Sequence, residues 1–93
     1  MTTYVVLFNW TEQGIRNYKD SPNRAEAAKK QWGEAGIQIK DLYWTVGPFD
    51  LVAVVEAPDD ESLTSGLLAL GAQGNLRSTT MRAFGAEEFA QLI

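Results

Sequence analysis

A very short connection between two apolar segments restricts the fold of this chain more than any other feature. Residues 37–46 are rich in β-branched and aromatic side chains, and residues 50–57 are rich in valine; both compositions are typical of β-strands. Only Gly47, Pro48 and Phe49 separate them. A parallel pair would need a crossover of roughly a dozen residues or more, so the sequence predicts that the two strands pair antiparallel.

Strand and helix signals alternate along the rest of the chain. Further strands are predicted at residues 2–10 and 75–84, and the alternation in residues 37–46 changes phase near Lys40-Asp41, which indicates a β-bulge. The serine oxygen of Ser21-Pro22 can accept a free N–H at a helix start, and proline suits the first helical turn. The predicted helices are a short turn after the cap Thr11, a main helix from Ser21-Pro22 to Gly36, a second helix from Pro58 to Gly74 and a short amphipathic helix at residues 86–93.

This order, β-α-β-β-α-β, predicts a single α+β domain over residues 1–93 with a ferredoxin-like fold, in which two main helices cover one face of a four-stranded antiparallel sheet. The strand at 50–57 is apolar on both faces, since Val52 and Val54 alternate with Leu51, Ala53 and Val55. Two helices cannot cover both faces. We therefore expect the second face to pack on a copy of itself, giving a homodimer with a barrel-like interior.

Composition excludes several classes of function. The net charge of −4 and the pI near 4.6 argue against a nucleic-acid partner, because that affinity depends largely on lysine and arginine contacts to phosphates. No apolar run reaches the roughly 20 residues that span a bilayer, so no membrane partner is expected. The absence of cysteine favours the cytoplasm and excludes disulfides and thiolate ligands of metals or haem iron. The absence of histidine excludes imidazole ligands of either. No cofactor and no metal are expected.

Four stretches of the sequence resemble the GYD-domain family, which belongs to the dimeric α/β-barrel group. They are "FNWTEQGIRNYKDSPNRAEAAKK", "GPFDLVAVVEAPDDE", "LALGAQGNLRSTTMRAF" and "EEFAQLI". The resemblance implies the ferredoxin-like fold and homo-oligomerisation, and it implies no particular activity. The Gly-Tyr-Asp triplet of the family would fall at Gly47, Phe49 and Asp50, with Pro48 inserted, or at Pro48-Phe49-Asp50. In either alignment phenylalanine replaces tyrosine, so the phenolic hydroxyl that could serve as a hydrogen-bond donor is absent.

Polar and aromatic residues near strand ends are the candidate ligand-binding residues. If they line a cavity, they could orient a small and partly apolar molecule. The opposing interpretation is that the tryptophans are packing residues with locally satisfied indole N–H groups, and that Asp50 caps its own loop or pairs with Arg77 or Arg82. The candidates are Asn9, Trp10, Tyr43, Phe49, Asp50 and Arg77, accompanied by Trp44, Thr79 and Arg82.

Other reactive side chains have simpler explanations. Residues 59–61 are three carboxylates at a predicted helix start, where capping and the helix dipole account for them better than a metal does. Residues 71–74 are followed by a strand, so this glycine-containing segment ends a helix and lacks the helix N-terminus of a phosphate-binding loop. No histidine is present to activate a serine or threonine nucleophile.

Two classes of function are consistent with the sequence. The first is a small homo-oligomeric module of accessory or small-molecule-binding function. The alternative is a cofactor-independent monooxygenase or an isomerase-like or cyclase-like enzyme, and it depends mainly on analogy with the fold group. A purely structural self-assembly without a ligand is a third possibility.

Overall fold

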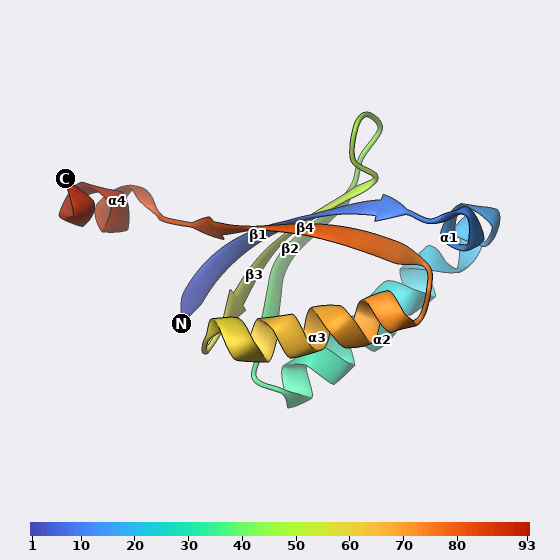
Figure 1. Cartoon of the computed structure of the whole chain (residues 1–93), viewed down its shortest axis with the longest axis horizontal. Helices are drawn as coiled ribbons and strands as arrows, with labels where there is room; N and C mark the ends of the chain where they lie inside the picture. The colour runs from blue at the N-terminus through green and yellow to red at the C-terminus, as the bar shows by residue number, and fades with distance from the viewer.

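The computed structural model describes all of residues 1–93 and contains one four-stranded antiparallel sheet in the order β2-β3-β1-β4 (Figure 1). Two main helices, α2 and α3, lie on one side of this sheet. The strands are β1 (Thr2–Trp10), β2 (Gln38–Trp44), β3 (Leu51–Ala57) and β4 (Leu76–Ala83). The helices are α1 (Glu12–Arg16), α2 (Ser21–Glu34), α3 (Asp60–Ala72) and α4 (Ala86–Leu92), with a 3-10 turn at Tyr18–Asp20. The predicted ferredoxin-like α+β fold is confirmed.

The register of the strands confirms the expected hairpin. β2 and β3 pair antiparallel from Gln38 opposite Glu56 to Trp44 opposite Leu51, and the register shifts between Ile39 and Asp41, where the sequence predicts a β-bulge. β1 lies between β3 and β4 and pairs antiparallel with both. The two edges of the sheet are therefore β2 and β4.

Local sequence decides most helix ends. Thr11 caps α1 by accepting a hydrogen bond from the Gly14 N–H, and Asp59 caps α3 by accepting one from the Ser62 N–H. The backbone N–H of Ser62 donates to the Asp59 carboxylate at 2.8 Å, and this bond lowers the pKa of Asp59 below the ordinary value. Gly36 follows α2 with a φ of +81°, the left-handed conformation that glycine adopts most easily.

The start of α2 differs from the prediction. The residue before the helix is Asp20, which makes no side-chain capping bond, and Ser21 is already helical and buried. The Ser21 hydroxyl accepts a hydrogen bond from the Trp44 indole N–H at 2.9 Å instead of capping the helix. The prediction that Ser21 accepts a free backbone N–H is therefore wrong, because a contact from β2 occupies its oxygen.

We call the sheet face that α2 and α3 cover the inner face. It holds the hydrophobic core, in which alternate residues of β1 and β3 are buried and pack against Trp32, Ile37 and Leu63. Each large apolar side chain that is fully buried in this way stabilises the fold by about 1.5–3 kcal/mol. The buried strand residues are Tyr4, Val6, Phe8, Leu51, Ala53, Val55 and Ala57.

The opposite face of the sheet, the outer face, is covered by no element of the chain (Figure 1). The C-terminal helix α4 does not cover it either, because α4 continues beyond the end of β4 and projects away from the body of the molecule. An ion pair between Arg82 and Glu88 at 3.8 Å connects this helix to β4. The fold thus leaves one sheet face and one helix without packing partners.

Candidate functional site

The end of β1 and the β2–β3 connection meet at a small polar junction. The Asp50 carboxylate accepts a hydrogen bond from the Trp10 backbone N–H at 2.8 Å, and the Asp50 N–H donates to the Phe8 carbonyl at 2.8 Å. The Asn9 side chain donates to the Pro48 carbonyl at 2.8 Å. Asn9 and Asp50 therefore use their polar atoms to fasten the connection to β1.

This geometry favours the simpler of the two interpretations of Asp50. Its carboxylate bonds to backbone, and its loop is closed further by the Thr45 N–H, which donates to the Asp50 carbonyl at 2.8 Å. Neither Arg77 nor Arg82 forms an ion pair with Asp50; Arg82 pairs with Glu88. The hydrogen bond from the Trp10 backbone gives the Asp50 carboxylate a structural role, which explains this residue without general acid or base chemistry.

Replacing Asp50 with alanine is expected to lower the free energy of unfolding by about 1.5–3 kcal/mol, since the hydrogen bond from Trp10 to a charged acceptor is lost. Asp50→Asn keeps an acceptor oxygen and should cost less than half as much. Urea denaturation followed by tryptophan fluorescence measures both values. Equal stability of Asp50→Ala and the unchanged protein would show that the Asp50 carboxylate contributes nothing to stability.

The structure brings four of the six candidate ligand-binding residues together and leaves Tyr43 apart. Asn9, Trp10, Phe49 and Asp50 lie at the junction, and Arg77 lies opposite Asn9 in the β1–β4 pairing. Tyr43 lies on β2, the edge strand opposite β4. Where paired residues run across the sheet from Tyr43 to Thr79, Val52 and Leu7 lie between them.

The candidates also lie on two different faces. The pairing places Asn9, Tyr43 and Arg77 on the outer face, whereas Trp10 alternates with Asn9 and points to the inner face. One cavity in a single chain cannot contain all of them. The outer-face candidates Asn9, Tyr43 and Arg77 could act together only at the edge of the sheet or in a site formed with a second copy of the chain.

The tryptophans differ in how their indole groups are satisfied. Trp44 donates to Ser21, as local packing predicts. The Trp10 indole nitrogen is buried and has no hydrogen-bond partner, which contradicts the expectation of local satisfaction. Trp10 opposes Leu76 at the end of the sheet and packs against the hydrophobic core, so its N–H lies in an apolar environment.

The outer face carries a contiguous apolar area across all four strands. We call it the outer-face patch. Its central members are half-buried, while Met81 and Tyr43 are 46% and 61% exposed. The residues of the outer-face patch are Val5, Leu7, Val52, Val54, Met81 and Tyr43.

Charged groups outside these regions have structural explanations. The buried Tyr4 hydroxyl donates a hydrogen bond to Asp60, and this bond together with burial raises the pKa of Tyr4 above its usual value. The contact fastens the start of α3 to β1. No group of three or more His, Cys, Asp or Glu side chains is placed to hold a metal ion. None of the helices is both long and apolar enough to cross a membrane.

Comparison with known proteins identifies relatives over nearly the whole chain. The family model of the GYD domain matches residues 4–93. The glutamine synthetase and cystathionine beta-lyase binding protein of Thermus thermophilus is 29% identical over 84 residues, which cover 89% of this chain and 88% of that protein.

Two solved structures are similar in fold. The crystal structure of TTHA0845 from Thermus thermophilus is 33% identical, with a TM-score of 0.55, and the match covers 92% of this chain and 96% of that one. The crystal structure of MtbAldR has a TM-score of 0.71 at 18% identity, which shows a shared fold alone. The match covers 90% of this chain and 52% of MtbAldR, so this chain spans about half of that protein.

Proposed function

The chain belongs to the GYD domain family, and from that premise we propose that it is a homo-oligomeric accessory module that binds other proteins. The similarity to a protein named for binding glutamine synthetase and cystathionine beta-lyase supports protein binding. We place this function in the cytoplasm, which the cysteine-free sequence favours.

The outer-face patch is the observation that carries the proposal of self-association. Contiguous apolar patches of this kind are uncommon on monomers and typical of interfaces. Two sheets pack face to face about 10 Å apart with their inner side chains interdigitating, and an uncovered four-stranded face suits this arrangement. Packing of the patch on a second copy would give the barrel-like homodimer, with the same surface used by both subunits.

Helix α4 is the candidate surface for contact with other proteins. Phe89 and Leu92 on its apolar side are 54% and 60% exposed, and Ile93, which follows the helix, is 94% exposed. Amphipathic helices with one such side bind grooves on partner proteins. The acidic residues Glu87 and Glu88 in the first turn would favour a groove with a basic rim.

The alternative of catalysis has less support. Two of the polar candidate residues that an enzyme could use are occupied, since the side chains of Asn9 and Asp50 bond to backbone. Tyr43 and Arg77 lie on the two edge strands of the outer face, so a shared site would require the second copy. The polar junction at Asn9, Phe49 and Asp50 remains a candidate surface for contact between the accessory module and its partners.

Native mass spectrometry and binding to purified enzymes test this proposal. We expect a dimer or larger oligomer at micromolar concentration, and saturable binding to glutamine synthetase or cystathionine beta-lyase from the organism that encodes this chain. Phe89→Glu should weaken enzyme binding at least about tenfold, because it places a charge in an apolar contact. Gln91→Glu, which changes charge elsewhere on α4, is the matched control. A monodisperse monomer would remove the self-association, and no binding to either enzyme would remove the proposed partners.

A further inference from the structure

A small cavity lies on the inner face, between the sheet and the two main helices. Its volume is about 50 Å³, and ten of its fourteen lining residues are hydrophobic. Phe8, Leu51 and Ala53 of the sheet form its floor, and Ala25 and Ala28 of α2 form one wall. The cavity is separate from the outer-face patch, because the sheet lies between them.

The cavity exists because the two helices approach closely at one end only. Near Gly66 of α3 an added Cβ atom would lie 3.0 Å from the Trp32 indole nitrogen, so no space remains there. Towards the start of α2, Ala25 and Ala28 present short side chains to the cavity, which Ser21, Arg24 and Trp32 of the same helix also line. The space that longer side chains would fill stays open.

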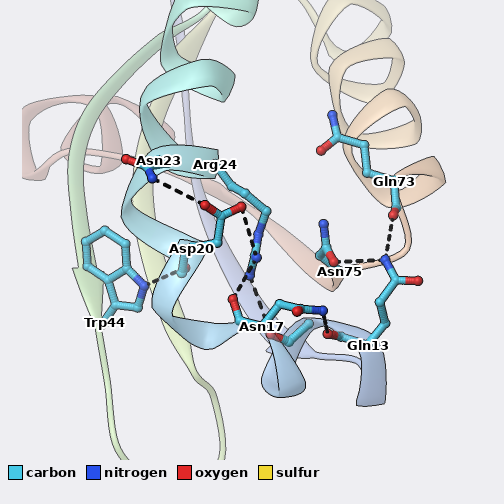
Figure 2. A network of polar contacts seen from close by, with 10 residues as sticks. Gln13, Asn17, Asp20, Asn23, Arg24, Trp44, Gln73 and Asn75 are labelled. Carbon is cyan, nitrogen blue, oxygen red and sulfur yellow. Dashed lines mark hydrogen bonds and ion pairs between the residues drawn. The ribbon is translucent and has the colours of Figure 1, made fainter.

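Arg24 lies at the mouth of this cavity and is unusually buried for a cation, with its side chain 18% exposed. Figure 2 shows its guanidinium between the start of α2 and the turn that follows α3. It donates to the Asn17 carbonyl at 2.9 Å and to the Gly14 carbonyl at 3.5 Å. Its ion pair with Asp20 is long, at 3.9 Å, and the Asp20 side chain is 63% exposed. A guanidinium has five N–H donors, so several remain unused.

The other polar groups at the mouth add donors. The Asn75 side-chain oxygen accepts from Gln13 at 2.9 Å, and its amide nitrogen has no partner (Figure 2). Ser21 already accepts from Trp44 and keeps a hydroxyl proton to donate. An apolar interior with a cation and spare N–H donors at its mouth fits a molecule with an apolar tail and an anionic head.

We propose that this cavity binds a short monocarboxylate. The carboxylate accepts hydrogen bonds from Arg24 and Asn75, and the tail fills the space beside Ala25 and Ala28. A volume of about 50 Å³ corresponds to roughly four water-sized groups, so it holds an aliphatic tail of about four carbons. Pentanoate has this size. This cavity is separate from the polar junction of Asn9, Phe49 and Asp50, and binding in it requires neither self-association nor protein partners.

Titration of the isotope-labelled full-length protein with pentanoate, acetate and pentan-1-ol, followed by NMR, tests the proposal. Each added methylene should improve binding about fourfold, so pentanoate, with three methylenes more, should bind about 60-fold tighter than acetate. Pentan-1-ol lacks the charge and should also bind at least about tenfold more weakly than pentanoate. Shifts are expected at amides that surround the cavity. Equal binding of acetate and pentanoate, or shifts confined to the outer face, would overturn the assignment.

A matched pair of variants on α2 identifies the cavity itself. Ala28→Leu fills the space and removes none of the hydrogen-bond partners of Arg24, so it should weaken pentanoate binding at least about tenfold. Ala27→Leu adds the same side chain at an exposed position of the same helix and should leave binding unchanged. Arg24→Gln should remove the preference for pentanoate over pentan-1-ol. Undiminished pentanoate binding by folded Ala28→Leu would refute the site, whatever the oligomeric state.

Discussion

Val54→Lys is expected to convert the protein from an oligomer to a monomer at micromolar concentration. Val54 lies near the centre of the outer-face patch, directly between Val5 on β1 and Asp41 on β2. Burying a valine contributes about 1.5–3 kcal/mol, and a lysine there brings a charge into an apolar interface. We expect a loss of at least about 3 kcal/mol of association free energy, or more than about 100-fold in Kd, measured by analytical ultracentrifugation.

Thr80→Lys is the control for this variant. Thr80 is an exposed residue of β4 on the inner face, so the same charge added there should leave association unchanged. Circular dichroism should show that both variants remain folded, because neither side chain is fully buried in the single chain. A folded Val54→Lys protein with unchanged Kd would mean that the outer-face patch is not the interface.

The elements that could be predicted from the sequence are those decided by neighbouring residues. The connection between β2 and β3, residues 45–50 in the structure, is too short for anything but a hairpin. The caps at Thr11 and Asp59 act on N–H groups three residues along the chain. Ser21 has the same local pattern, yet its hydroxyl accepts from Trp44, which is 23 positions away. A tertiary contact of that kind has no local signal.

The candidate site is harder to predict because it depends on strand register. Asn9 and Asp50 meet only because Phe8 lies opposite Leu51, and a shift of one residue would turn each side chain to the other face. Alternation shows which residues share a face but does not show which residues of two strands lie opposite each other.

The cavity could not be predicted from the sequence either, because it depends on how closely the helices and the sheet approach each other. Helical spacing places Ala25 and Ala28 on one buried stripe, and nothing in the sequence says that the opposite wall stays too distant to fill the space. In the sequence, Arg24 has the pattern of an exposed helix residue. In the structure, α1 and the α3–β4 turn enclose it. Small residues on the core side of a helix, with one cation beside them, are the signal that could suggest such a cavity.

Gly14→Ala is expected to destabilise the protein more than any other substitution to alanine outside the core. A Cβ atom at Gly14 would lie 2.0 Å from the Asn75 carbonyl oxygen and 2.9 Å from its carbon, both of which are backbone atoms. The contact cannot relax locally, because the same carbonyl accepts the Thr11 N–H at 3.1 Å and the Thr11 hydroxyl donates to Gly74. Helix α1 must therefore move away from the α3–β4 turn. We expect a loss of about 3 kcal/mol or more in urea denaturation, a large share of the roughly 5–14 kcal/mol typical of this chain length.

Gly33→Ala separates this clash from the general effect of replacing a helical glycine. Gly33 lies in α2, and a Cβ atom there would meet nothing within 4 Å. Alanine should stabilise that helix by about 0.5–1 kcal/mol, because it restricts the unfolded chain. The two variants should therefore change stability in opposite directions. Because Asn75 also lies at the mouth of the cavity, folded Gly14→Ala protein should bind pentanoate more weakly, whereas Gly33→Ala should bind it normally. Equal stability of the two variants would mean that α1 does not pack closely on the α3–β4 turn.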